Sequence, residues 1–88
     1  MAWTIKYAET ARKQLRKLDK SDARRIAGFM DERIAVSDDP RRMGKALKGP
    51  LGSLWRYRVG DFRVICDIQD GVLVVLVLQI GNRREVYR

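Results

Sequence analysis

Basic and apolar residues alternate with period two along residues 54–65, which read Leu-Trp-Arg-Tyr-Arg-Val-Gly-Asp-Phe-Arg-Val-Ile. This alternation is typical of half-buried β-strands. Gly60-Asp61 can close a two-residue type II′ hairpin, because glycine tolerates a positive φ at the first central position. That register places Arg58 directly opposite Arg63, and like charges that face each other across strands are destabilising. A stable fold keeps such a pair most readily beside an anion or a carboxylate, so the segment indicates an anion site.

Phosphate is the anion that these side chains suit best, since a planar guanidinium group can hold two oxygens at once. The whole chain of 88 residues is basic, with a net charge of +8 and a pI of about 10.3. A basic domain of this size points to nucleic acid, the ribosome or an acidic protein as its partner. Plainer explanations stay open: Arg56 and Arg58 could form an ordinary solvated face, and Arg63 could pair with Asp67.

Several kinds of catalytic site are excluded by composition. The chain has no histidine, which rules out a Ser-His-Asp triad, a Cys-His dyad and any His-ligated metal site. The single cysteine, Cys66, cannot form an intrachain disulfide, and its apolar strand pattern predicts a buried, inert thiol. No cluster of carboxylates suggests a divalent metal, so we expect neither a metal site nor a cofactor.

Cleavage of RNA by such a site needs a base for the 2′-hydroxyl, positive charge for the phosphorane and an acid for the leaving oxygen. Arginine supplies the charge but stays protonated. Tyrosine is the best proton carrier available, because nearby guanidinium groups lower a phenol pKa from about 10. Tyr87 could serve in this way, or could be a frayed end or a packing anchor, whereas Tyr57 is a predicted core residue. Asp67 and Glu85 are weaker candidates. Metal-free attack through the 2′-hydroxyl would leave a 2′,3′-cyclic phosphate.

The elements that would position these residues follow from periodicity and turn signals. Alternation predicts a first strand over residues 3–7, and apolar spacing predicts helices over 9–18 and 21–36, the second ended by Pro40. A loop over residues 41–53 leads to three strands, 54–59, 62–69 and 72–80, with a type I′ turn at Asp70-Gly71 between the last two. The order is βααβββ, which predicts an α+β fold: the N-terminal strand and helical hairpin pack on an antiparallel sheet.

The two hairpin registers sort the strand residues into two faces. The helices would cover the apolar face, which consists of Tyr57, Val59, Phe62, Val64, Cys66, Ile68, Val75 and Val77. The other face would carry the arginines, and consists of Arg56, Arg58, Arg63, Ile65, Asp67, Leu76 and Leu78. The last strand is apolar on both faces and is predicted to be central.

Length predicts one domain over residues 1–88. The N-terminus lacks the apolar run of a signal peptide. The apolar stretch 72–80 is too short for a membrane helix. We therefore expect a cytoplasmic protein with no membrane contact.

Three segments together resemble the RelE/ParE toxin superfamily, and most closely the RelE branch of bacterial type II toxin–antitoxin systems. They are residues 47–49 (Leu-Lys-Gly), 54–65 and 80–87 (Ile-Gly-Asn-Arg-Arg-Glu-Val-Tyr). The resemblance implies a RelE-like fold and a ribosome-dependent mRNA interferase, a metal-independent endoribonuclease that cuts mRNA in the ribosomal A site. It also implies a cognate RelB-like antitoxin, which holds the toxin inactive and through which the complex would bind operator DNA.

The resemblance also implies roles for particular residues. Arg63 and Arg83 would stabilise the phosphorane, and Tyr87 would transfer a proton or stack on a base. The residues implied to bind RNA are Arg56, Arg58 and Lys48.

The chain departs from this family at two points, which leaves the general base open. Some relatives have lysine where Arg56 and Arg58 stand, and many have histidine where Asn82 stands. Two alternatives remain on the same fold: a ParE-like toxin that inhibits DNA gyrase without cleaving anything, and an inactive member that serves mainly as its antitoxin's partner.

Overall fold

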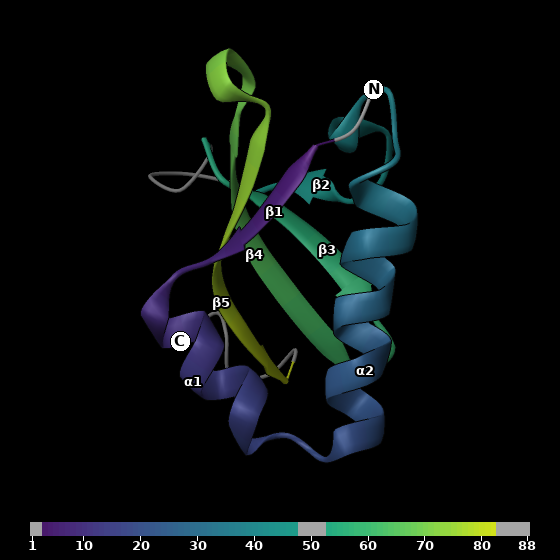
Figure 1. The fold of residues 1–88 in the computed structure, drawn as a ribbon, viewed down its shortest axis with the longest axis vertical. Coiled ribbons are helices and arrows are strands. Elements are labelled where there is room, and N and C mark those ends of the chain that lie inside the picture. The colour runs from purple at the N-terminus through teal and green to yellow at the C-terminus, as the bar shows by residue number, and fades with distance from the viewer. Residues whose placement is uncertain (1–2, 48–52, 83–88) are drawn as a thin grey trace.

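The computed structural model describes residues 3–47 and 53–82, which form an α+β fold (Figure 1). Strand β1 (Thr4–Tyr7) leads into helix α1 (Glu9–Lys17) and helix α2 (Lys20–Phe29), which a π-helical turn, Met30–Ile34, extends. A 3-10 turn, Pro40–Arg42, precedes strands β2 (Lys45–Ala46), β3 (Trp55–Val59) and β4 (Phe62–Gln69). A second 3-10 turn, Asp70–Val72, precedes strand β5 (Val74–Asn82). The predicted fold class and element order are confirmed, with β2 as an additional short strand in the predicted loop.

The five strands form one sheet in the order β1-β5-β4-β3-β2. Strand β5 lies inside it, between β1 and β4, as its apolar composition predicts. The predicted antiparallel pairing of the last three strands is confirmed, and β1 joins their sheet by pairing with β5 in parallel. Parallel neighbours need a long crossover connection. Here both helices and the other strands separate β1 from β5 along the chain.

The β3–β4 hairpin has the predicted register, with Val59 opposite Phe62 and Arg58 opposite Arg63. Gly60 adopts a φ of 61°, as the turn requires.

The predicted type I′ turn at Asp70-Gly71 is wrong. Residues 70–73 connect β4 to β5, and Leu73 takes a left-handed conformation with a φ of 53°. The Asp70 carboxylate accepts two hydrogen bonds from the Arg41 guanidinium, at 2.9 and 2.8 Å. Turn rules based on neighbouring residues do not include this distant partner, which connects the longer turn to the Pro40–Arg42 segment.

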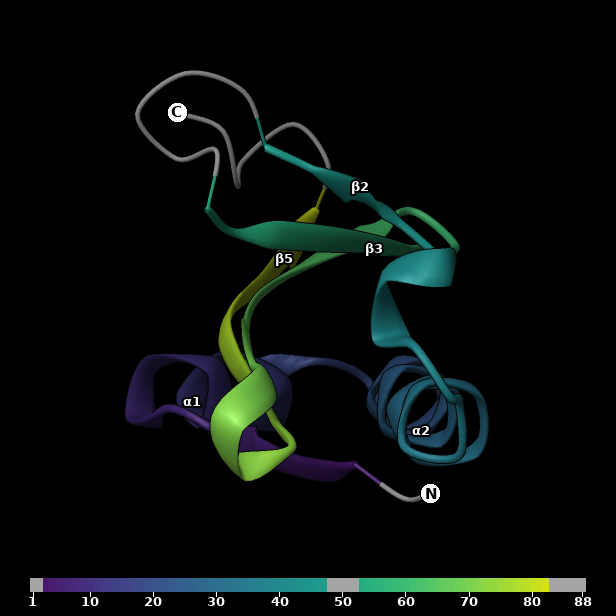
Figure 2. The ribbon, with the colours of Figure 1, turned by 90° about the horizontal axis from the view of Figure 1, so that it is seen from above.

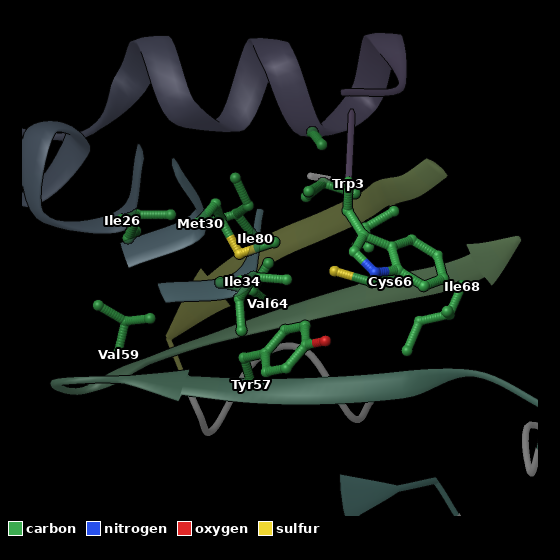
Figure 3. Packing of buried hydrophobic residues seen from close by; sticks show 13 residues of the cluster. Trp3, Ile26, Met30, Ile34, Tyr57, Val59, Val64, Cys66, Ile68 and Ile80 are labelled. Atoms are coloured by element: carbon green, nitrogen blue, oxygen red, sulfur yellow. The ribbon is translucent and has the colours of Figure 1, made fainter. Parts of the chain in front are cut away.

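The core lies between the helices and one face of the sheet (Figure 3). Figure 2 shows both helices on the same side of β2 and β3. The predicted apolar face is confirmed: Phe62 is half-buried and packs against the core, and the other members are buried, namely Tyr57, Val59, Val64, Cys66, Ile68, Val75 and Val77. Cys66 is buried as predicted, and that burial raises the pKa of its thiol. A bulge between Ile65 and Cys66 shifts the β4–β5 register, so Ile80 joins the core at 2% exposure.

Tyr57 is a core residue, and its hydroxyl donates a hydrogen bond to the Pro40 carbonyl oxygen at 2.6 Å. Tyr57→Phe is expected to destabilise the fold by about 1–2 kcal/mol, because the buried carbonyl loses its donor. Urea unfolding would measure this. Tyr7→Phe is the matched control: in the described part of the chain the buried Tyr7 hydroxyl has no hydrogen-bond partner, so its removal should not destabilise the fold. Equal losses in the two variants would contradict the assigned role of the Tyr57 hydrogen bond.

Candidate functional site

A pocket of about 240 Å³ opens where β2, β3 and β4 meet. Four cationic side chains contribute to its lining, and they are Lys45, Arg56, Arg58 and Arg63. The three arginines alternate with the buried residues of β3 and β4, which places them on the face opposite the core. The structure thus brings together the arginines that the sequence analysis assigned to one face.

Two like-charged pairs face each other across neighbouring strands in this pocket. Lys45 of β2 lies opposite Arg56 of β3, and Arg58 of β3 lies opposite Arg63 of β4. On its other side Arg63 lies opposite Gly81 of β5, which has no side chain to fill the space beside the guanidinium group. Cross-strand pairs of this kind repel each other, and the arrangement concentrates positive charge on one face of the sheet.

The arginine face is not an ordinary solvated face. Arg58 is exposed, but Arg56 and Arg63 are half-buried, and Ile65 on the same face is only 5% exposed. Nearby Asp67 is half-buried and accepts a hydrogen bond from the Gln69 side-chain nitrogen at 3.1 Å. Partial burial of the Arg56 and Arg63 side chains strengthens their attraction for an anion, because less water screens the charges.

Lys45 is a pocket residue that sequence reasoning missed. Its neighbour Gly44 adopts a φ of 77°, and a Cβ there would overlap the carbonyl oxygen of Arg56. Only glycine lets this segment approach β3 so closely. The segment is further held by Trp55, whose indole nitrogen donates a hydrogen bond to the Met43 carbonyl oxygen at 2.7 Å. Nothing in the local sequence Gly44-Lys45, within a basic loop, indicates that this segment pairs with β3.

Two of the three tyrosines lie on the core side and do not suit proton transfer. Burial raises the pKa of Tyr7 to about 12, with a smaller contribution from the negative charge of Asp31. Burial likewise raises the pKa of Tyr57. Both phenols therefore stay protonated near neutral pH, and neither can act as a base there.

The remaining predicted site residues, Lys48, Arg83 and Tyr87, lie outside the described residues, as does Glu85. Their assigned roles stay predictions.

Within residues 3–47 and 53–82, no group of three or more histidine, cysteine or acidic side chains is arranged to hold a metal ion. No helix in the same ranges has the length and apolar character needed to cross a membrane.

Comparison with known proteins shows what kind of protein carries this pocket. A protein-family model described as the ParE toxin of the type II toxin–antitoxin system parDE matches residues 5–87. Among curated proteins, Toxin RelG of Mycobacterium tuberculosis is 30% identical over 89 residues, covering 100% of this chain and 99% of the relative. Toxin RelE of the same organism is 33% identical over 84 residues, covering 96% of this chain and 84% of the relative.

Solved structures show the same fold. The crystal structure of the toxin–antitoxin complex RelBE2 from Mycobacterium tuberculosis has a matching chain with a TM-score of 0.86 and 26% identity, covering 97% of this chain and 95% of that one. The archaeal RelE–RelB complex from Pyrococcus horikoshii has one with a TM-score of 0.73 and 27% identity, covering 98% and 100%. With the family model matching almost the whole sequence, the chain belongs to the RelE/ParE superfamily, the toxins of type II toxin–antitoxin systems.

Proposed function

We propose that this toxin is an endoribonuclease that cleaves mRNA on the ribosome and so inhibits translation. The observation that carries the proposal is the pocket with two like-charged cross-strand pairs, Lys45 with Arg56 and Arg58 with Arg63. A polyanion that lies against both pairs offsets the repulsion within each pair and gains charge-assisted hydrogen bonds from the guanidinium groups. The phosphodiester backbone of RNA supplies that charge.

The chemistry proposed for this pocket is attack of the 2′-hydroxyl on the adjacent phosphate, which breaks the bond to the leaving 5′-oxygen and forms a 2′,3′-cyclic phosphate. Arg63 and Arg83 stabilise the extra negative charge of the phosphorane. Guanidinium groups supply the charge stabilisation, so the step needs no metal. The backbone on either side is held by Arg56, Arg58 and Lys48.

Proton transfer is assigned to Tyr87, with Lys45 as the second candidate. Arginine stays protonated in proteins, whereas an amine can give up its proton. Lys45→Arg keeps the charge and removes this capacity, which makes it a clean comparison with Tyr87→Phe.

Primer extension on a reporter mRNA in a reconstituted translation reaction tests the proposal. We expect discrete cuts that require ribosomes and that vanish with Arg83→Ala. A loss with Tyr87→Phe but not with Lys45→Arg would assign the proton to the phenol, and the reverse would assign it to the amine. Intact mRNA with the wild-type protein would remove the nuclease proposal.

Inhibition of DNA gyrase is the second candidate, because the matching family model is described as a ParE toxin. Positive charge alone does not separate the two functions, but a toxin that only binds has no need for Arg63, Arg83 and Tyr87 together. If the wild-type protein leaves mRNA intact and inhibits supercoiling by gyrase, gyrase inhibition would replace mRNA cleavage as the proposed function. Translation arrest that is lost in Arg63→Ala would argue against a third possibility, an inactive member.

We further propose a RelB-like antitoxin as the partner, since related toxins have been solved in complexes with RelB. The net charge of +8 suits an antitoxin segment with acidic and apolar residues that folds as it binds. It would cover the helices and approach the arginine face, and the complex would bind operator DNA through the antitoxin. A complex in which neither surface is covered would contradict this.

A further inference from the structure

We propose that a groove between α2 and the β3–β4 turn is a second phosphate-binding site, which carries single-stranded RNA that flanks the segment in the pocket. The groove has a volume of about 430 Å³ and is separate from the pocket described above. Four arginines contribute to its lining: Arg24, Arg25, Arg33 and Arg58. That the ligand is RNA rests on the proposed function. That the groove binds an anion rests on its lining residues alone.

The groove and the pocket are continuous through one side chain. Arg58 lines both, so it stands where one positively charged surface passes into the other. Helix α2 contacts β3, which holds the two surfaces in a fixed relation (Figure 1). A chain of phosphates that leaves the pocket past Arg58 therefore enters a groove with three further arginines in its lining.

The arginines of the groove are available to a ligand. Arg24, Arg25, Arg33 and Arg58 are all exposed, and within residues 3–47 and 53–82 none has a salt bridge or a side-chain hydrogen bond. Elsewhere on the surface Arg41 is paired with a carboxylate at 2.8 Å. The groove thus differs from a salt-bridged surface in having its cations uncompensated by neighbours.

One carboxylate, that of Glu32, also lines the groove, and it lies against the helix backbone. A Cβ on Gly28, one helical turn earlier, would be 3.2 Å from the Glu32 Oε2 atom. Four cations against one anion leave the lining strongly positive.

Gly60 brings the helix and the hairpin together. A Cβ at this position would lie 2.8 Å from Nη1 of Arg25 and 3.2 Å from its Cζ, so the guanidinium group rests where a side chain would otherwise stand. The contact links α2 to the turn that follows Arg58 and Val59 of β3. Arg25 and Arg58 thus line one groove, which favours a ligand with several negative charges.

The floor of the groove favours a polyanion over a protein segment. Val59 is only 5% exposed, and Phe29 is half-buried, with its ring centroid 5.8 Å from that of Tyr57 in the core. A docked peptide gains most from apolar anchors in deep pockets, and this floor offers little apolar surface. A phosphate backbone needs guanidinium groups along a track, and these are what the groove presents.

Binding of an uncleavable RNA, with 2′-O-methyl groups in place of the attacking hydroxyls, tests the groove over a series of salt concentrations. The variant is Arg24→Gln, Arg25→Gln and Arg33→Gln together, which leaves the pocket intact. Its matched control removes three exposed cations from β1 and α1: Lys6→Gln, Arg16→Gln and Lys17→Gln. Fluorescence anisotropy would compare a dodecanucleotide, long enough to leave the pocket, with a trinucleotide that fills only the pocket.

For the dodecanucleotide, we expect the slope of log affinity against log salt concentration to be smaller in magnitude by about 2 in the groove variant. Each phosphate contact to a single strand contributes about 0.7 to this slope, and the variant removes three arginines. The control variant should keep the wild-type slope, and the trinucleotide should bind wild type and groove variant alike. Circular dichroism would confirm that both variants are folded.

Three results would overturn the proposal: equal slopes for the groove variant and the wild type, the same loss in the control variant, or no measurable RNA affinity in the wild type. An unchanged RNA slope with weakened antitoxin binding would assign the groove to the protein partner instead. Because the RNA cannot be cleaved, a wild type that cuts no mRNA leaves this comparison intact. A wild type that cuts mRNA but shows equal slopes overturns the groove alone.

Discussion

Arg63→Ala is expected to slow mRNA cleavage by about 10²–10³-fold, the usual effect of removing one preorganised group that stabilises a developing negative charge. Arg63 stands in the pocket between Arg58 on β3 and Gly81 on β5. Its half-buried guanidinium group is held on a central strand, so it needs little reorganisation as the phosphorane forms.

Single-turnover cleavage on ribosomes programmed with a defined mRNA would measure this effect at saturating toxin. Arg16→Ala removes the same charge from the exposed face of α1 and should cleave at the wild-type rate. Arg63→Lys should fall between the two, because it keeps the charge and loses the two-pronged contact with phosphate. A wild-type rate for Arg63→Ala would show that the phosphorane is stabilised elsewhere.

Gly44→Ala is expected to destabilise the fold by at least about 3 kcal/mol, which would lower the melting temperature by about 10 °C or more. The backbone at Gly44 has a φ of 77°, where a side chain is strained. The added Cβ would also overlap the Arg56 carbonyl oxygen and lie 2.9 Å from Trp55 Nε1 and Tyr57 Cδ1. The carbonyl belongs to the sheet backbone and cannot move aside without disturbing β3.

The same substitution should weaken RNA binding in any protein that still folds, because β2 would separate from β3 and take Lys45 out of the pocket. Thermal unfolding is the first measurement. Gly71→Ala is the control, since a Cβ there meets no atom within 4 Å and the backbone φ is not positive. That change should stay within about 0.5 kcal/mol of the wild type. Similar losses at the two glycines would contradict the role given to Gly44.

The sequence by itself determined the arginine face and its register. Alternation with period two assigns each residue of β3 and β4 to one face, and the Gly60 turn sets which residues oppose each other. Arg58 and Arg63 therefore had to meet, and the structure places them opposite each other. The family was also readable from sequence, because the residues that carry the resemblance lie in three short segments, and the family model that matches residues 5–87 confirms it.

Only the tertiary structure decided the features that depend on partners far apart in the chain. Lys45 enters the pocket because Trp55 and Tyr57 hold residues 40–44 through hydrogen bonds that span 12 and 17 positions. The Asp70 turn departs from its local preference, and Arg41, 29 residues away, binds its carboxylate. The groove exists because α2 packs beside the end of β3, which carries Arg58, and the turn at Gly60. Local periodicity specifies faces and turns, whereas such long-range contacts depend on how whole elements pack, and no pattern in the sequence records them.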